Sequence, residues 1–189
     1  MTQTVWIVVA VIIVAVLIAI GIFWSRRRRS EHLRDRFGPE YDRAVDAKGD
    51  RAKAEVELAK REKRVEKLNI RPLDPAERRE FESRFDEVQA RFVDDPPRAV
   101  AFADALLGDV MKARSYPVSD FDQRAGDISV DHPVVVEHYH QAHDIALRQE
   151  RGEASTEDLR QAMIHYRALF DNLVGVEAPE AREPEPAHH

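Results

Sequence analysis

Four histidines between positions 132 and 143 are the side chains of this sequence best suited to chemistry. The segment Glu137-His138-Tyr139-His140 contains one Glu-x-x-His pair, the spacing that di-iron proteins built on helix bundles use. His143 follows three residues after His140. A di-iron centre also needs a second such pair and two further carboxylates that point inward, and the segments expected to be helical offer no second pair.

The face on which these residues fall decides between a metal site and a polar surface. At 100° per residue, Glu137, His140 and Asp144 lie opposite the apolar line that runs through Tyr139 and Ala146. We therefore expect a solvated polar face and assign no metal ligand and no cofactor.

His132 is placed differently, between Asp131 and Pro133 at the expected start of a helix. We expect it to brace the long connection before it, and we expect His143 and His165 to lie at the edge of the core. A catalytic role for His132 requires a nucleophile or a second acid-base group. The connection offers four such side chains without a spacing that selects one: Ser119, Asp120, Asp127 and Ser129. Phosphate-binding glycine loops and serine-nucleophile elbows are absent from the sequence. We assign no catalytic residue; the alternative is a membrane-tethered hydrolytic or metal-dependent enzyme that uses Glu137, His140 and His143, or His132.

The elements that position these side chains follow an apolar run over Val5 to Trp24, which holds no charged residue. About 20 residues of helix cover roughly 30 Å of bilayer hydrocarbon, so we predict a transmembrane helix over 5–24. Trp6 and Trp24 fall at its two ends, where an aromatic belt places tryptophan. The run is too long for a signal peptide, and no basic residue precedes it.

A basic collar follows the run and orients it. It consists of Arg26, Arg27, Arg28 and Arg29. The positive-inside rule places residues 1–4 outside the cell and the remainder in the cytoplasm. The collar serves as an orientation signal or, alternatively, as a site for anionic lipid. The reversed topology, with the domain outside the cytoplasm, is the third alternative.

The charge balance restricts the partners. The 29 basic and 35 acidic side chains become 25 and 35 once the collar is removed, a net charge of about −10 beyond it. An acidic domain is repelled by nucleic acid, so we expect none as a partner, and we expect no small-molecule ligand. The chain has no cysteine, which excludes disulfides and thiolate chemistry.

Beyond the collar and linker (25–38), residues 39–68 are rich in Ala, Glu, Lys and Arg and predict a charged helical stalk, with a break at Gly49-Asp50. Val45, Ala52 and Ala59 recur every seven residues, which permits a coiled coil. Since the apolar positions are thin, we favour a solvated stalk or a helix docked along one edge.

Residues 69–175 predict a bundle of about four amphipathic helices, so the fold class is all-α. Asp74-Pro75 begins the first of them, and Phe81, Phe85, Val88 and Phe92 form its stripe. The second begins after Asp94-Asp95. The connection over 115–131, which we expect to be packed by its own side chains, contains at most a short helix around 120–125. Asp131-His132-Pro133 begins the third helix and a capping box at Ser155 to Asp158 the last. Residues 176–189 are acidic and proline-rich and predict a disordered tail.

Several segments of this bundle resemble an uncharacterised family of bacterial proteins with one N-terminal span and a helical domain. They are Gln89 to Pro96, Tyr116 to Val118, Ser129 to Pro133 and Ala154 to Met163. The resemblance covers roughly 36–173 and implies a setting at a bacterial inner membrane or cell membrane, without an activity or functional residues. We therefore expect a non-enzymatic, membrane-anchored helical domain that contacts the lipid bilayer and binds another protein or itself.

Overall fold

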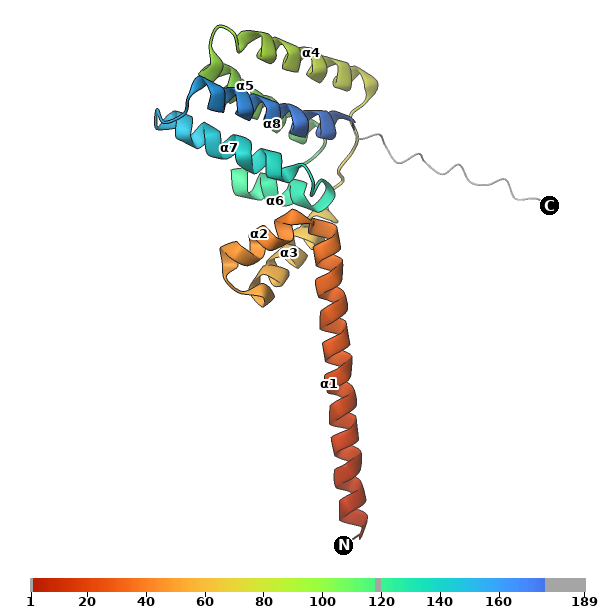
Figure 1. Ribbon diagram of the computed structural model, residues 1–189. Coiled ribbons are helices and arrows are strands. Elements are labelled where there is room, and N and C mark those ends of the chain that lie inside the picture. Colours follow the sequence, from red (N-terminus) through yellow and green to blue (C-terminus); the bar gives the residue numbers. More distant parts are fainter. Residues whose placement is uncertain (1, 118–119, 176–189) are drawn as a thin grey trace, which may run out of the picture. The chain divides into compact units, whose positions relative to one another are not determined.

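The structure, a computed structural model, describes residues 2–117 and 120–175, with the side chains of 2–5, 7–15, 19, 22 and 26 outside that description (Figure 1). All secondary-structure elements in these ranges are α-helices, which confirms the predicted all-α class. The helices are α1 (Thr2–Phe37), α2 (Pro39–Lys48), α3 (Arg51–Val65), α4 (Pro75–Arg91), α5 (Pro96–Ala113), α6 (Phe121–Asp131), α7 (Val136–Glu150) and α8 (Thr156–Gly175). The chain divides into two compact units, Met1–Ala59 and Lys60–His189. The predicted tail, 176–189, lies outside the described residues.

In the first unit, two glycines separate three helices. Gly38, followed by proline at the first position of α2, ends α1, and Gly49 closes α2 in a left-handed conformation with φ 61°. At the start of α3, the Asp50 carboxylate accepts hydrogen bonds from the backbone N–H groups of Ala52 and Lys53, at 2.8 and 3.2 Å. The predicted break at Gly49-Asp50 is confirmed. Because the break lies inside the seven-residue series, that series does not run along one helix.

No helix among the described residues combines the length and the apolar character that crossing a membrane requires. The span predicted over 5–24 falls largely on residues whose side chains lie outside the description, and it stays a prediction.

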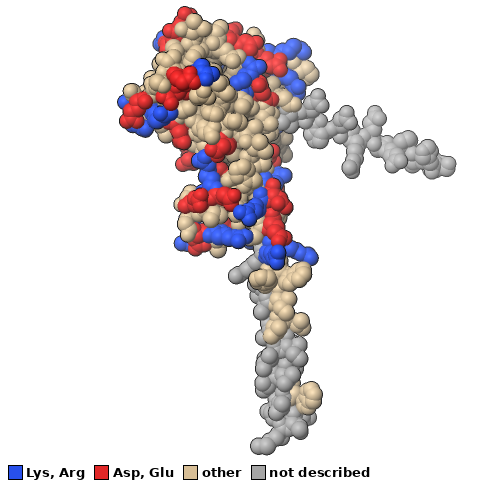
Figure 2. Space-filling view, in the orientation of Figure 1, with Lys and Arg blue, Asp and Glu red and all other residues tan. Residues whose placement is uncertain are grey.

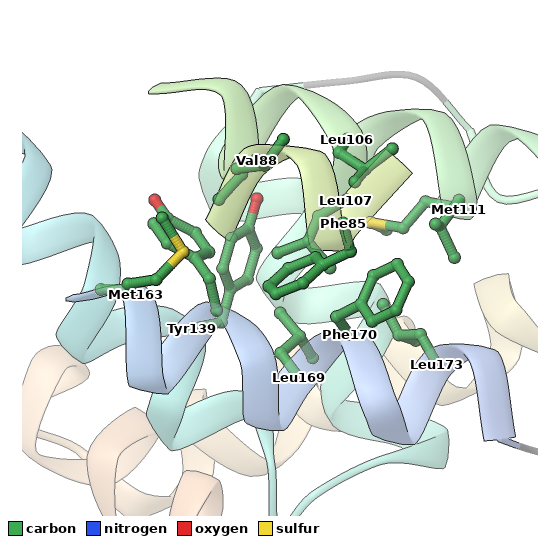
Figure 3. Close-up of a cluster of buried hydrophobic side chains, with 14 of the residues drawn as sticks. Phe85, Val88, Leu106, Leu107, Met111, Tyr139, Met163, Leu169, Phe170 and Leu173 are labelled. Carbon is green, nitrogen blue, oxygen red and sulfur yellow. The ribbon is translucent and has the colours of Figure 1, made fainter. Parts of the chain in front are cut away.

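In the second unit, α8 lies between α5 and α7, α4 packs on α5 and α8, and α6 packs on α7 (Figure 1). The apolar stripes of these helices meet in one core (Figure 3). The predicted stripe of α4 is confirmed for Phe81, Phe85 and Val88, which are buried, whereas Phe92 is the C-cap residue and is half-buried. Phe85 meets Phe170 of α8 with ring centroids 4.4 Å apart.

The long connection before α7 is mostly helix, which corrects the prediction. Helix α6 spans Phe121–Asp131. The Asp120 carboxylate caps its start by accepting a hydrogen bond from Gln123 N–H, at 2.9 Å, and the burial of Ala125 and Ile128 stabilises the helix. His132 is therefore the C-cap of α6, and α7 begins only at Val136. The bundle accordingly has five described helices where about four were expected.

The predicted starts of α4 at Asp74-Pro75 and of α8 at Ser155 are confirmed. Asp74 accepts from Ala76 and Glu77 N–H, both at 2.8 Å, while Glu77 accepts from Asp74 N–H. At the start of α8, Ser155 and Asp158 exchange the reciprocal bonds of a capping box. These caps satisfy backbone donors that a helix leaves unpaired and so define where α4 and α8 begin.

Candidate functional site

His132, the predicted brace, lies in a buried polar cluster at one end of the bundle. Its Nε2 is 3.5 Å from Nη1 of Arg114, the buried C-cap residue of α5. Arg114 donates from Nη1 to the carbonyl of Leu173, at 3.0 Å, and from Nε to the carbonyl of Arg71, at 3.3 Å. The backbone N–H of Arg71 in turn donates to the carbonyl of Arg114, at 3.0 Å. Arg114 thus ties the connector before α4 to the last turn of α8.

The electrostatics of this cluster favour a structural role. Leu173 lies in the last turn of α8, where carbonyls lack helical partners and the helix dipole is negative, so a cation is stabilised there. Burial lowers the pKa of Arg114. Burial, and then the charge of Arg114, lower the pKa of His132, which keeps its imidazole neutral. The neutral ring fills the space beside the guanidinium without adding a second buried charge.

A second polar contact lies within the second unit, between Arg64 near the end of α3 and Asp127 of α6. Arg64 donates from Nε to Oδ1 of Asp127, at 2.8 Å, and the two also form an ion pair. The Asp127 side chain is buried, and burial raises its pKa against the lowering effect of Arg64. Two predicted loop candidates, Asp127 and Ser129, are therefore buried within a helix, where Ser129 donates to the carbonyl of Gly126 at 2.7 Å. Ser119 lies outside the described residues.

An aromatic and polar cluster lies where α5, α6, α7 and α8 meet. Tyr139 donates to Asp104 at 3.4 Å, and Arg124 pairs with the same carboxylate at 3.5 Å. The guanidinium of Arg124 also lies over the Tyr139 ring, 5.7 Å from its centroid. Burial raises the pKa of both Tyr139 and Tyr166, so these hydroxyls stay protonated. One carboxylate and one guanidinium thus position side chains from three helices.

The predicted polar face of α7 is covered in part by α6. The ring of Phe121 stacks on His143, with centroids 3.6 Å apart, and meets His140 edge-on at 5.5 Å. His143 lies at the edge of the core, as expected, and burial lowers its pKa. His140 is half-buried, so the prediction of a fully solvated face is wrong at this residue. The reason is that α6, which was expected to be mostly a connection, packs against this side of α7. Among the described residues, no three or more His, Cys, Asp or Glu side chains form a group able to hold a metal ion, so Glu137, His140 and His143 are not brought together as ligands.

Sequence reasoning missed one pair of histidines. His138 of α7 and His165 of α8 place their Nδ1 atoms 3.0 Å apart, with ring centroids at 5.2 Å. Both side chains are half-buried. Neither residue has a local motif with the other, because 27 positions separate them. Only the way α7 packs on α8 brings them together.

The first unit has its own polar cluster around Glu55 of α3. This carboxylate accepts from Ser30 of α1, from Tyr41 of α2 at 2.8 Å and from Arg51 at 2.9 Å. Burial by itself raises the pKa of Glu55, but the three donors outweigh it and lower the pKa below its usual value. Glu55 therefore remains ionised and connects all three helices of the unit.

An open groove with an apolar floor lies on the surface of the bundle, between α4 and α8. Its volume is about 300 Å³, and it is lined by Gln89, Phe92, Arg160, Met163, Ile164 and Arg167. Arg167 donates to Gln89 at 2.8 Å and pairs with Asp171, while Arg160 pairs with Glu157. On the face that Figure 2 shows, acidic and basic side chains are interspersed and neither sign forms a continuous patch.

Comparison with models of known protein families, with curated proteins and with solved structures found no match.

Proposed function

We propose that this chain is a single-pass membrane protein whose helical bundle binds a partner protein and performs no reaction itself. The observation that carries the proposal is the uncharged run from Val5 to Trp24, followed by the arginine collar. This run lies inside α1, a helix of 36 residues. Such a helix is about 54 Å long, enough to cross roughly 30 Å of hydrocarbon and extend beyond it.

The collar supports a cytoplasmic location for both compact units. Arg27, Arg28 and Arg29 are exposed on α1, where they can meet lipid phosphates. Each basic residue near an anionic leaflet contributes roughly 1 kcal/mol, and their position after the run favours an N-terminus outside the cell. The lipid bilayer is thus the first partner.

The cluster around Glu55 supports a role in mounting. Glu55 accepts from the extension of α1, from α2 and within α3, so the helices after the anchor are held together by more than one side chain. Leu33 and Phe37, one turn apart on α1, are buried. A helix extension that is packed in this way holds α2 and α3 next to the proposed anchor.

The groove between α4 and α8 supports protein binding by the bundle. Phe92, Met163 and Ile164 give it an apolar floor, and Ile164 is 47% exposed. Arg160 and Arg167 stand at the rim, and each guanidinium has five N–H donors, more than their internal contacts use. The occupant that fits is a partner's helical segment with an apolar side chain flanked by carboxylates or carbonyls.

Topology is tested with a reporter fused after Leu173 in the full chain, together with protease added outside intact cells. The proposal expects cytoplasmic reporter activity and a protected bundle. When Arg26 to Arg29 are replaced by glutamine and basic residues are added before Val5, the proposal expects an inverted chain, with no cytoplasmic reporter activity and a bundle that external protease digests. Digestion of the unaltered chain from outside contradicts the proposed mounting.

Partner binding is tested by photo-crosslinking in native cells, with a photoreactive amino acid placed at position 164 of the full chain. The matched control is position 147, because Leu147 is also an exposed aliphatic residue, 38% exposed, on α7. We expect a discrete adduct with one other protein from position 164 only, and its loss when Arg160 and Arg167 are replaced by glutamine. Equal patterns from both positions, or an adduct of two copies of this chain, contradict the proposed occupant.

A further inference from the structure

His138 and His165 approach each other in a geometry that requires a proton between them. With the two Nδ1 atoms 3.0 Å apart, one nitrogen donates and the other accepts through its lone pair. When that proton is removed, both nitrogens offer lone pairs to the same small volume. Burial, and then the electrostatic effect of the neighbouring His138, lower the pKa of His165. The lowered pKa favours the neutral imidazole, which is the form that metals bind.

The spacing of the two nitrogens matches the bite of a transition metal ion. Two histidines on tetrahedral Zn²⁺, with Zn–N near 2.05 Å, stand about 3.3 Å apart. Two adjacent ligands of square-planar Cu²⁺ stand about 2.8 Å apart. The observed separation of 3.0 Å lies between these two values, so small rotations of the two side chains reach the separation that either metal ion requires.

We propose that His138 and His165 form a two-histidine site for a divalent transition metal ion of the Zn²⁺ and Cu²⁺ class, held between α7 and α8. Because no group of three or more ligand side chains occurs among the described residues, water completes the coordination. The half-buried rings leave the ion open to solvent, and it therefore exchanges.

The site has a mechanical consequence. His138 is the third residue of α7, and Val135, the N-cap residue of this helix, provides no side-chain cap. His165 lies in the middle of α8. A metal ion on both rings fixes the uncapped first turn of α7 to a well-packed helix. Metal binding therefore raises the stability of the folded bundle.

The test uses the full chain in detergent, with His188→Ala and His189→Ala in every sample so that the terminal histidines do not bind metal. Zn²⁺ affinity is measured by calorimetry, and Cu²⁺ coordination by electron paramagnetic resonance. We expect one ion per chain, two nitrogen ligands and a melting temperature raised by about 5 °C at saturating metal. His138→Gln and His165→Gln should each weaken binding by at least about tenfold.

His143→Gln is the matched control, because His143 is also a half-buried histidine of α7 but contacts Phe121. It should bind metal as tightly as the parent. Far-UV circular dichroism verifies that each variant is folded without metal. The proposal is overturned if the parent binds no ion, if His138→Gln and His165→Gln bind as the parent does, or if His143→Gln lowers affinity equally.

Discussion

Replacing Arg114 by methionine tests whether a buried guanidinium holds the end of the bundle together. The Arg114 side chain donates to the carbonyls of Leu173 and Arg71, and its guanidinium lies over the Tyr116 ring, 5.7 Å from the centroid. Methionine retains most of the aliphatic stem and removes every donor. The change therefore isolates the polar contacts from the packing.

The expected loss of stability follows from the groups that the substitution leaves behind. A buried carbonyl without a donor costs about 1–3 kcal/mol. Arg114→Met leaves the buried carbonyl of Leu173 without its side-chain donor and removes the half-buried hydrogen bond to the carbonyl of Arg71. Part of this cost is offset because a charge is no longer buried, the same effect that lowers the pKa of Arg114. We expect a net loss of about 2–4 kcal/mol in the free energy of unfolding.

Urea unfolding of the full chain in detergent measures this loss. Both tryptophans, Trp6 and Trp24, lie in the proposed anchor, so the bundle is followed by far-UV circular dichroism and by the near-UV signal of its tyrosines. With a urea dependence of about 2 kcal/mol per M, the midpoint should fall by about 1–2 M. Arg151→Met is the control, since Arg151 and its partner Glu153 are both exposed, and it should change stability by less than about 0.5 kcal/mol. Equal midpoints for the two variants refute the reasoning.

Three further substitutions test the core, a buried histidine and a cap. Phe85→Ala should cost about 3–5 kcal/mol in the same urea assay, because the ring is fully buried against Phe170; a loss below 1 kcal/mol contradicts the packing. Because the folded chain lowers the pKa of His132, the unfolded chain takes up the proton first as the pH falls below about 6.5. Stability should therefore decrease from that pH down to the lowered pKa, by up to about 1.4 kcal/mol per pH unit, and His132→Asn should reduce the slope of stability against pH. Asp74→Ala removes two backbone hydrogen bonds of 2.8 Å and should cost about 1 kcal/mol in thermal unfolding; no change in melting temperature counts against the capping box.

The elements that could be predicted from the sequence are those with local causes. The start of α4 follows from Asp74-Pro75, and the start of α8 from Ser155 and Asp158, because a cap bonds to residues two or three positions away. The stripe through Phe81, Phe85 and Val88 follows from helical periodicity alone. For such features the sequence contains both partners within one turn of helix.

The errors have one physical source, which is packing between segments distant in the chain. Helix α6 was expected to be largely a connection because its buried apolar side chains, Ala125, Ile128 and Val130, form a stripe too short for periodicity to reveal. Its presence changes the surroundings of α7, where Phe121 covers His140 and His143. The meeting of His138 with His165 depends on the register of α7 against α8, which no local pattern encodes.

These long-range polar contacts explain how helices with similar apolar stripes select one arrangement. The stripes of α5, α7 and α8 are built from apolar side chains, with Ala and Val in each helix, at the same period, so hydrophobic burial alone fits several registers. A shift of α8 by one helical turn keeps its stripe buried. It displaces the Leu173 carbonyl by about 5.4 Å along the helix axis, which breaks its hydrogen bond with Arg114. The same slip separates His165 from His138. Each slip leaves buried polar groups unpaired, at a cost of several kcal/mol, and that difference selects the observed register.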